Sequence, residues 1–421
     1  MNLFKSKLFI FFIFIFIICI GVFFLKFSRE SNSWPFNSKI GKYFPAEIKK
    51  VIYSISDPYF DQTIETFYYD LKVEYFRIPY LNSLGLGGSI NEIYNNVILV
   101  TLNDGQNFIY NIDNNSFRKI NYNKIKKNFI SIRDVEIIHN LDQSHLIILG
   151  IKEDKKGCRS LELQKINMTY NYLENSIQFN KTKKIWNSEI KCKGHTAINT
   201  FGSRVIFIDG HYYVTMGYVE SSGPGGINNY SQDKNSMFGK ILKIDENGNY
   251  TIYSSGHRNP QGLFFSTNKN KIFSTEHGPS GGDELNLIIE SKNYGWPCET
   301  FGILYEYKNN ENLMNPWPID IFNCDKIDFQ KPLFSWTPSI AISQGLEYSG
   351  DEFKYFKNSF IIGSLKGSSL FRINIDKKNI VRNIERININ ERVRDIIQLN
   401  DGKIFVLADS GNLLLIKKIG K

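Results

Sequence analysis

Short runs of apolar and β-branched residues, separated by Asn-Gly or Asp-Gly pairs, recur along the chain from about residue 80 onward. These turn residues accept the positive φ angles of tight antiparallel connections, so each run-turn-run unit predicts a β-hairpin. The clearest runs are residues 97–101, 205–208, 212–216, 240–244 and 404–408. Sustained helical periodicity is almost absent from the same stretch. The chain is therefore predicted to be all-β.

Many hairpins in a chain of 421 residues fit either a sandwich or a propeller. Their near-even spacing favours the propeller, whose radial closure protects strand edges. No WD-type repeat is visible, so periodicity does not set the number of blades. No Pro/Gly/Ser-rich linker divides the chain after residue 40, which predicts a single domain over residues 41–421. Residues 30–80 are less regular and are expected to form a connector and the first strands.

Residues 8–25 form an uninterrupted apolar run of 18 residues, with Lys5 and Lys7 before it and Lys26 and Arg29 after it. A bilayer span needs ~17–25 residues, whereas a secretion signal has an apolar region of ~7–15. No small-residue cleavage site follows, so we predict an uncleaved transmembrane signal anchor, and a cleaved signal peptide is the alternative. The expected order is a cytoplasmic stub (1–7), the anchor (8–25), a linker (26–40) and a domain on the periplasmic side of the cell membrane.

The cysteines agree with export. Beyond the anchor the chain has four, Cys158, Cys192, Cys298 and Cys324, and none has the C-x-x-C spacing of a zinc site. Two disulfides, Cys158 with Cys192 and Cys298 with Cys324, are one interpretation, and buried free thiols are the other. The net charge of +9 is spread out, and no arginine-rich stripe with interleaved aromatics indicates a nucleic-acid partner.

Two polar loops carry the residues that are able to bind a ligand or a metal ion. Residues 256–262 place Arg258 beside Asn259, and a charged planar donor next to an amide suits a carboxylate-bearing planar ligand. Residues 276–286 gather carboxylates with Gly and Pro, which are oxygen donors of the kind that calcium prefers. A blade-connecting turn and a solvated acidic turn are the respective structural alternatives.

These loops occur in order with Asn293-Tyr294-Gly295-Trp296-Pro297, and the whole resembles the soluble glucose and sorbosone dehydrogenase family. The resemblance continues through residues 337–341, 363–367 and 392–395, and it covers roughly residues 130–415. Members of that family are six-bladed propellers that bind pyrroloquinoline quinone and calcium. The resemblance therefore implies a six-bladed propeller that oxidises a sugar or related alcohol and passes electrons to a periplasmic or membrane acceptor.

The resemblance also implies roles for individual residues. Contacts to the quinone are expected from Arg258, Asn259, Ser339, Lys366, Arg392 and Arg394. Calcium ligands are expected at Gly278 and Pro279, through their carbonyl oxygens, and a second, structural calcium at Asp283, Glu284 and the carbonyl of Tyr294. Bound calcium would polarise the reactive carbonyl of the quinone.

Two departures concern the catalytic base. The family has a histidine four residues before an arginine, and this chain has Thr200 before Arg204. The aspartate that supports that histidine is replaced by Tyr218. Threonine cannot act as a base near neutral pH, whereas histidine titrates in the useful window. His195 and His277 are the candidates for a substitute base. The alternative for His195 is a loop or capping role, and the alternative for His277 is a structural role in the calcium loop.

Two functions therefore compete. One is a quinone-dependent sugar dehydrogenase with a relocated base. The other is a propeller that has lost turnover and acts as a ligand- or partner-binding module, which the replacements at Thr200 and Tyr218 favour. Retention of Arg258, Lys366, Arg392 and Arg394 favours a bound quinone in either case.

Overall fold

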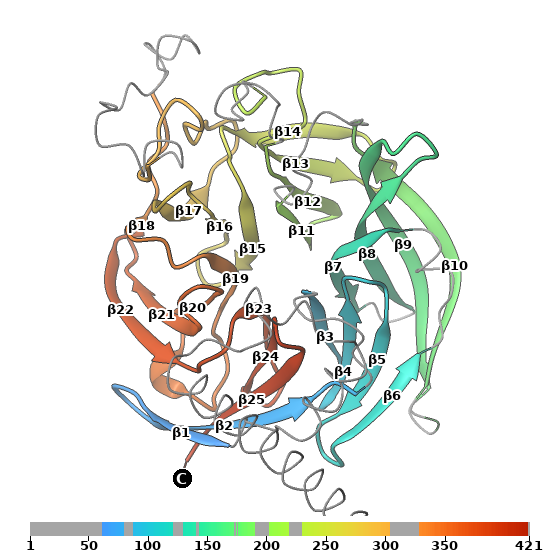
Figure 1. Cartoon of the computed structure of the whole chain (residues 1–421), viewed down its shortest axis with the longest axis vertical. Coiled ribbons are helices and arrows are strands. Elements are labelled where there is room, and N and C mark those ends of the chain that lie inside the picture. Colours follow the sequence, from blue (N-terminus) through green and yellow to red (C-terminus); the bar gives the residue numbers. More distant parts are fainter. Residues whose placement is uncertain are drawn as a thin grey trace, which may run out of the picture. The chain divides into compact units, whose positions relative to one another are not determined.

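The structure is a computed structural model that describes residues 61–79, 87–120, 129–139, 143–171, 174, 176–189, 202–218, 230–303 and 328–419. These residues form six antiparallel sheets arranged radially around a central axis, which is a six-bladed β-propeller (Figure 1). The predicted all-β fold and the propeller architecture are confirmed. The predicted stub, anchor and linker lie outside the described residues. Within the described ranges no helix is long and apolar enough to cross a membrane.

Five sheets have four strands each, in sequence order. The first is β3 (Gly88–Tyr94), β4 (Val97–Leu102), β5 (Asn107–Asn111) and β6 (Ser116–Ile120). The second is β7 (Ser131–Ile138), β8 (Ser144–Glu153), β9 (Arg159–Asn171) and β10 (Ser176–Asn187). The third is β11 (Gly202–Ile208), β12 (His211–Met216), β13 (Lys240–Asp245) and β14 (Tyr250–Ser255).

The fourth sheet is β15 (Pro260–Ser266), β16 (Lys271–Glu276), β17 (Asp283–Ile288) and β18 (Phe334–Trp336). The fifth is β19 (Ile342–Glu347), β20 (Phe360–Ser364), β21 (Ser369–Ile375) and β22 (Val381–Asn388), with a short 3₁₀ helix, η4 (Lys354–Phe356), between β19 and β20.

The sixth sheet joins the two ends of the described chain. It is built from β1 (Gln62–Glu65), β2 (Asp70–Arg77), β23 (Val393–Gln398), β24 (Ile404–Ala408) and β25 (Asn412–Lys418). Strand β2 pairs with β25 over seven residue pairs, from Leu71 opposite Lys418 to Arg77 opposite Asn412. The N-terminal strands thus complete the last blade, and the ring closes through backbone hydrogen bonds.

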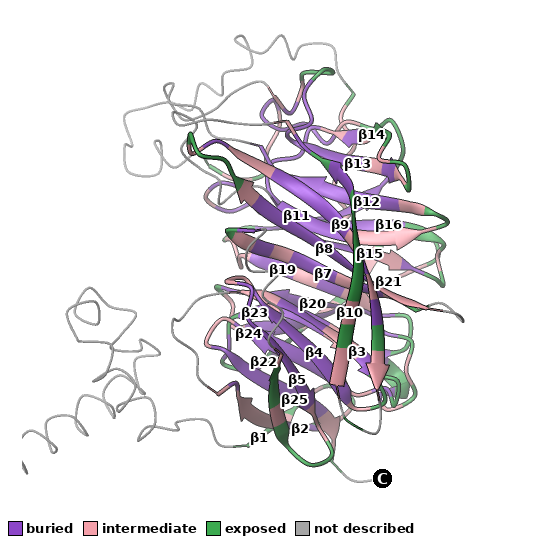
Figure 2. Cartoon of the chain, turned by 90° about the vertical axis from the view of Figure 1, so that its right-hand side faces the viewer, coloured by how far each residue is buried: buried purple, intermediate pink, exposed green. Residues whose placement is uncertain are grey.

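The predicted turns lie between the predicted strands. Asp209 and Gly210 join β11 to β12 with φ angles of 47° and 75°, which are the left-handed values that the Asp-Gly pair predicted. Apolar side chains of neighbouring blades pack together: Leu149 of β8 and Leu242 of β13 are both fully buried in one cluster. Buried residues accordingly fill most of β11 and β12 in the side view, whereas the outer strand β10 is largely exposed (Figure 2).

Cys158 and Cys298 are disulfide-bonded. Cys192 and Cys324 lie outside the described residues, so the pairing of the four cysteines stays a prediction.

Candidate functional site

The innermost strands are the first strand of each four-stranded sheet and β23 of the sixth sheet, and these six strands surround a cavity on the propeller axis. Its volume is about 420 Å³, within the range of ~300–1,000 Å³ typical of small-molecule sites. It is lined at the starts of the inner strands and by adjoining loops; we call it the axial cavity. Its lining residues include Arg133 and Ile132 of β7, Arg204 of β11, Gln261 of β15, Ser343 of β19 and Arg394 of β23, together with Asn259 and His277.

Irregular strand pairing occurs at one level of the inner strands. The register shifts between Ile132 and Asp134 on β7, between Pro260 and Gly262 on β15, and between Val393 and Asp395 on β23. A β-bulge redirects the side chain of the extra residue. The residues at these three shifts are Arg133, Gln261 and Arg394, and all three line the axial cavity.

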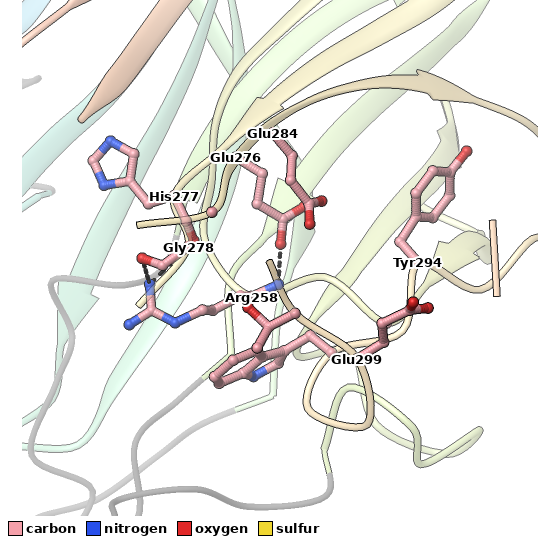
Figure 3. A pocket seen from close by; sticks show the side chains of 11 residues that line it. Arg258, Glu276, His277, Gly278, Glu284, Tyr294 and Glu299 are labelled. Carbon is pink, nitrogen blue, oxygen red and sulfur yellow. Dashed lines mark hydrogen bonds between the residues drawn. The ribbon is translucent and has the colours of Figure 1, made fainter. Parts of the chain in front are cut away.

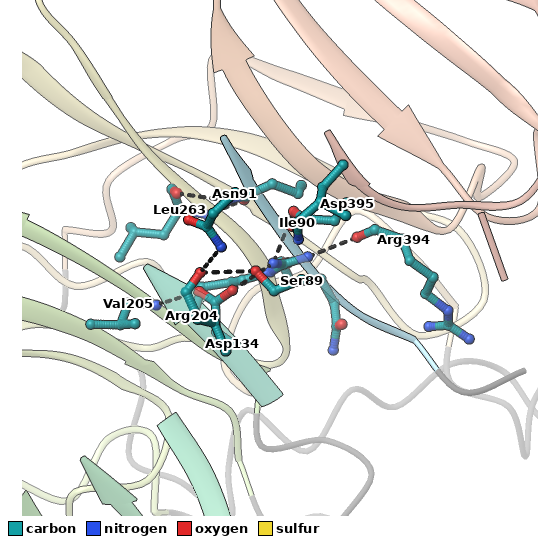
Figure 4. Close-up of polar contacts among 12 residues, drawn as sticks. Ser89, Ile90, Asn91, Asp134, Arg204, Val205, Leu263, Arg394 and Asp395 are labelled. Atoms are coloured by element: carbon teal, nitrogen blue, oxygen red, sulfur yellow. Dashed lines mark hydrogen bonds and ion pairs between the residues drawn. The ribbon is translucent and has the colours of Figure 1, made fainter. Parts of the chain in front are cut away.

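Below the axial cavity, Arg204 forms a buried ion-pair cluster with Asp134 and Asp395 (Figure 4). Its Nη1 lies 2.9 Å from Oδ1 of Asp134 and 3.1 Å from Oδ1 of Asp395. The same guanidinium donates to the backbone carbonyls of Gln261 (3.0 Å) and Arg394 (2.7 Å). The three charged residues are 4–7% exposed. One side chain thereby connects β7, β11, β15 and β23.

Burial and charge oppose each other in this cluster. Burial raises the pKa of Asp395 to about 6, because a buried carboxylate loses its hydration, while Arg204 acts in the opposite direction. Burial alone would lower the pKa of Arg204, but the two carboxylates raise it. The guanidinium of Arg204 therefore stays charged, and its charge stabilises the ionised forms of Asp134 and Asp395.

A second cavity, of about 590 Å³, lies at the other ends of the same inner strands; we call it the lower cavity. Among its described lining residues are five carboxylates, Asp134, Glu136, Asp209, Glu347 and Asp395, and no lysine or arginine. Burial raises the pKa of Glu136 to about 8, and the charges of Asp134 and Asp395 raise it further. The two cavities share none of their described lining residues, and Arg204 with its two partners lies between them.

The Arg258 loop is fixed from beneath by a buried polar network. His257 is fully buried, with Nε2 2.8 Å from Oγ of Ser254 and Nδ1 2.9 Å from Oε2 of Glu276. The other oxygen of Glu276 accepts the backbone N–H groups of Arg258 and Asn259. Glu276 thus ties the predicted ligand-binding loop to the predicted calcium loop that follows it.

The guanidinium of Arg258 contacts two aromatic rings that also contact each other, with its centre 5.4 Å from the ring of Tyr218 and 5.1 Å from that of Trp296. Its Nη1 donates to the carbonyl of His277 (3.1 Å) and to that of Gly278 (2.8 Å; Figure 3). It lines a small separate cavity of about 10 Å³ with Glu276, Glu284 and Glu299. Tyr218, in place of the family's aspartate, therefore contacts the arginine predicted to bind the quinone.

The predicted calcium ligands lie close together, but most of the functional atoms already have partners. Asp283 is 1% exposed and accepts hydrogen bonds from Oγ of Ser339 (3.0 and 2.8 Å) and from the backbone N–H groups of Gly278 (3.2 Å) and Ile342 (3.3 Å). Burial, with the neighbouring carboxylates, raises the pKa of Glu284 to about 8. Pro279 is buried. Tyr294 is held by its hydroxyl, which donates to the carbonyl of Leu287 (2.5 Å), whereas the atom predicted to bind calcium is its carbonyl oxygen. In the described ranges no three His, Cys, Asp or Glu side chains converge as a metal site.

Of the six predicted quinone contacts, two line the axial cavity and two are exposed next to it, whereas Arg258 and Ser339 are not among its lining residues. Asn259 and Arg394 line the axial cavity. Lys366 and Arg392 are exposed next to it: Lys366 follows Leu365, a lining residue, and Nη1 of Arg392 lies 3.4 Å from the carbonyl of Leu365. Arg392 and Arg394 share one counter-ion, Asp409, at 2.9 and 2.7 Å. Ser339 contacts Asp283.

Of the two candidate bases, the structure describes only His277, because His195 and Thr200 lie outside the described residues. Nε2 of His277 lies 2.5 Å from the carbonyl of Ile342, which requires the proton on Nε2 and leaves Nδ1 as an acceptor. Burial lowers the pKa of His277 and so favours the neutral ring. His277 lines both the axial cavity and the small cavity beside Arg258.

Sequence reasoning missed Arg133, Asp134 and Gln261. A signal was present: Ile132-Arg133-Asp134-Val135 and Val393-Arg394-Asp395-Ile396 share one pattern on two inner strands. In both, the arginine lines the axial cavity and the aspartate binds Arg204.

Comparisons with known proteins bear on this geometry. Residues 89–417 match the family model described as Glucose / Sorbosone dehydrogenase. An uncharacterized protein of Synechocystis sp. is 33% identical over 237 residues, which are 52% of this chain and 55% of that protein. The aldose sugar dehydrogenase of Escherichia coli (strain K12) is 29% identical over 235 residues, 52% of this chain and 60% of that enzyme. The chain thus spans about half of the length of the curated relatives it matches.

Solved structures agree on the fold. The soluble aldose sugar dehydrogenase of Escherichia coli in the apo-form aligns with a TM-score of 0.66 at 21% identity, over 83% of this chain and 100% of that one. The PQQ-bound aldose sugar dehydrogenase of Streptomyces coelicolor aligns with a TM-score of 0.52 at 18% identity, over 82% of this chain and 98% of that one.

We expect Arg204→Met to lower the free energy of unfolding by about 3–5 kcal/mol, because it leaves two buried carboxylates without their cation. Thermal and denaturant unfolding measure the change. Arg382→Gln, at an exposed ion pair on β22, is the control and should change it by less than about 0.5 kcal/mol. Adding Asp395→Asn to Arg204→Met should recover part of the loss. Equal stability of Arg204→Met and the control would contradict the role given to this cluster.

The raised pKa of Glu136 predicts a pH dependence of stability. Its native pKa of about 8 lies above the usual glutamate pKa of 4.5, so the folded protein binds this proton more tightly than the unfolded chain. The free energy of unfolding should therefore fall as the pH rises from about 4.5 to 8. Glu136→Gln should reduce that fall, measured as the melting temperature at pH 5 and pH 8, whereas Glu65→Gln, at an exposed position on β1, should not.

Proposed function

The chain belongs to the glucose/sorbosone dehydrogenase family, and on that premise we propose that it oxidises a sugar or related alcohol with pyrroloquinoline quinone and calcium. The observation that carries the proposal is the cationic axial cavity. Arg133, Arg204 and Arg394 line it, and no aspartate or glutamate is among its described lining residues. A planar ligand with three carboxylates requires such surroundings.

The described residues fit the quinone. A cavity of about 420 Å³ can hold a tricyclic ligand, and Asn259 and Arg394 would contact it. Ser343, which also lines the cavity, has a buried hydroxyl without a hydrogen-bond partner among the described residues. When bound, the quinone would accept the hydride from the substrate carbon, and calcium would polarise the quinone carbonyl.

The fit to calcium rests on backbone oxygens. The Gly278 carbonyl accepts from Arg258, and a carbonyl oxygen has a second lone pair that a cation can use. Asp283 is engaged by Ser339 and by two backbone N–H groups, so in this chain it holds the loop in shape. Of the two carbonyls expected to bind calcium, that of Gly278 already accepts from Arg258, and that of Pro279 is the second expected ligand.

His277 is the proposed base. Its Nε2 proton is held by the carbonyl of Ile342, and the remaining nitrogen, Nδ1, can take a proton from a substrate hydroxyl in the axial cavity. His195 stays the alternative base. The predicted anchor, the extracytoplasmic location and the electron acceptor belong to the same proposal and follow from the apolar run at residues 8–25 and from the family.

The competing function is a binding module without turnover. It is favoured by Thr200 and Tyr218, and by the contact of Tyr218 with Arg258, which replaces a base-supporting carboxylate with a ring that holds the guanidinium. The two functions differ in one observable, reduction of bound quinone by substrate.

Reconstitution of the full chain with calcium and the quinone tests the proposal. We expect tight binding of the quinone, and Arg394→Gln should weaken it by about 10–100-fold, since a charge-assisted contact contributes roughly 1.5–3 kcal/mol. Titration by quinone absorbance gives the dissociation constants. Arg382→Gln, which alters an exposed arginine of β22, should bind as wild type does. Absence of binding to the wild-type chain would reject the enzyme and the quinone pocket together.

Addition of aldoses to the loaded chain should bleach the quinone absorbance, and His277→Gln should slow that step by about 100-fold or more while leaving quinone binding within a few-fold. A Thr200→His variant restores the family residue and should raise the rate in the His277→Gln background. Bound quinone that no sugar reduces, in wild type or in Thr200→His, would establish the binding module. An unchanged rate in His277→Gln would assign the proton transfer to another residue.

A further inference from the structure

We propose that Arg133 and Arg394 form an anion-binding subsite of the axial cavity, which holds a carboxylate of the ligand that occupies it. The subsite itself stands on the geometry of β7 and β23. The identity of its ligand rests on the proposed function.

Arg133 is directed into the cavity by the local structure of β7. Ile132 pairs with Gly150 and Asp134 with Leu149, so Arg133 is the extra residue of a bulge. The two residues next to Arg133 make other contacts. Asp134 binds Arg204, and Ile132 is 2% exposed in a hydrophobic cluster. Arg394 occupies the equivalent place on β23. Two blades therefore present a guanidinium to the same space.

The three arginines of the axial cavity differ in how many carboxylate counter-ions they have. Arg204 has two carboxylate partners, and Arg394 shares Asp409 with Arg392. Arg133 makes no hydrogen bond or ion pair with any other described residue. It is the cavity arginine that lacks a counter-ion in the described part of the chain.

Crowding of like charges supports the same conclusion. Burial lowers the pKa of Arg133 to about 10, and the charges of Arg394 and Arg204 lower it further. At neutral pH the side chain is still charged, so three guanidinium groups repel one another around an enclosed space. A bound anion relieves that repulsion, whereas a neutral ligand leaves it in place.

The chemistry of the subsite selects a planar oxyanion. A guanidinium binds a carboxylate through two parallel N–H···O hydrogen bonds, a geometry that lysine cannot reproduce. Under the proposed function a carboxylate has two sources: an acid group of the quinone, or that of an acidic sugar such as a uronic acid. A neutral aldose provides neither, so the subsite distinguishes acidic from neutral substrates only if the quinone leaves it open.

The test compares full-length wild type, Arg133→Gln, Arg133→Lys and the exposed control Arg382→Gln. One arm titrates pyrroloquinoline quinone in the presence of calcium. A second arm measures glucuronate and glucose on the quinone-loaded chain, as kcat/KM and by calorimetry. A third arm measures glucuronate binding to the quinone-free chain. We expect Arg133→Gln to weaken one carboxylate ligand at least 10-fold, Arg133→Lys to recover part of that loss, and the control to change nothing.

The arms separate the sources. Weaker quinone binding with an unchanged glucuronate-to-glucose ratio assigns the subsite to the cofactor. A fall in that ratio with unchanged quinone binding assigns it to an acidic substrate. Unchanged affinity for both ligands in Arg133→Gln overturns the proposal. If the wild-type chain binds no quinone, the proposed function fails, and the third arm still decides the subsite: glucuronate that binds wild type and Arg133→Gln equally, or neither, overturns it.

A purely structural role for Arg133 has a different signature. Loss of a packing residue lowers the melting temperature of the ligand-free protein. Relief of repulsion between guanidinium groups maintains or raises it, and we expect the latter for Arg133→Gln. A lowered melting temperature together with unchanged ligand binding would reassign Arg133 to the fold.

Discussion

The buried contact of Arg204 with Asp134 and Asp395 is the constraint around which the axis of this propeller is organised. The blades are separate sheets that meet largely through apolar side chains, and such contacts have no direction. The guanidinium adds direction: it reaches the carboxylates of β7 and β23 and the carbonyls of β15 and β23. Asp395 extends the network to β3, because it accepts the backbone N–H of Ile90. Five inner strands are thereby held at one level, and the residues just above that level line the axial cavity.

The bulges at this level of the inner strands place Arg133 and Arg394 at the axial cavity without burying their charges in the apolar core. Bulges at Arg133, Gln261 and Arg394 direct one residue of each strand upward, while the aspartates that follow the two arginines turn toward Arg204. In each pair the arginine therefore lines the cavity, and the aspartate binds Arg204. The loop of Arg258 uses a different device, in which two rings and two carbonyls hold the guanidinium and Glu276 holds the backbone.

Short sequence motifs predicted those turns and loops whose conformation depends only on adjacent residues. Asp209-Gly210 predicted its hairpin because the positive φ requirement is a property of two adjacent residues. The motifs around Arg258 and Asp283 predicted two loops that the structure brings together. The partners of Arg204 could not be predicted, since Asp395 lies 191 positions away and the pairing depends on ring closure. Arg133 was missed because a bulge reverses the alternation by which strand residues are assigned to faces. Ser339 was predicted to contact the quinone. It contacts Asp283 instead, because the loop that carries Ser339 lies against the predicted calcium loop.

The separation of the two cavities has a consequence for the electric field along the propeller axis. Arg204 and its partners lie between the axial cavity and the lower cavity, which share none of their described lining residues. An anion is attracted from one side of the ring and repelled from the other, which makes the propeller electrically polar along its axis.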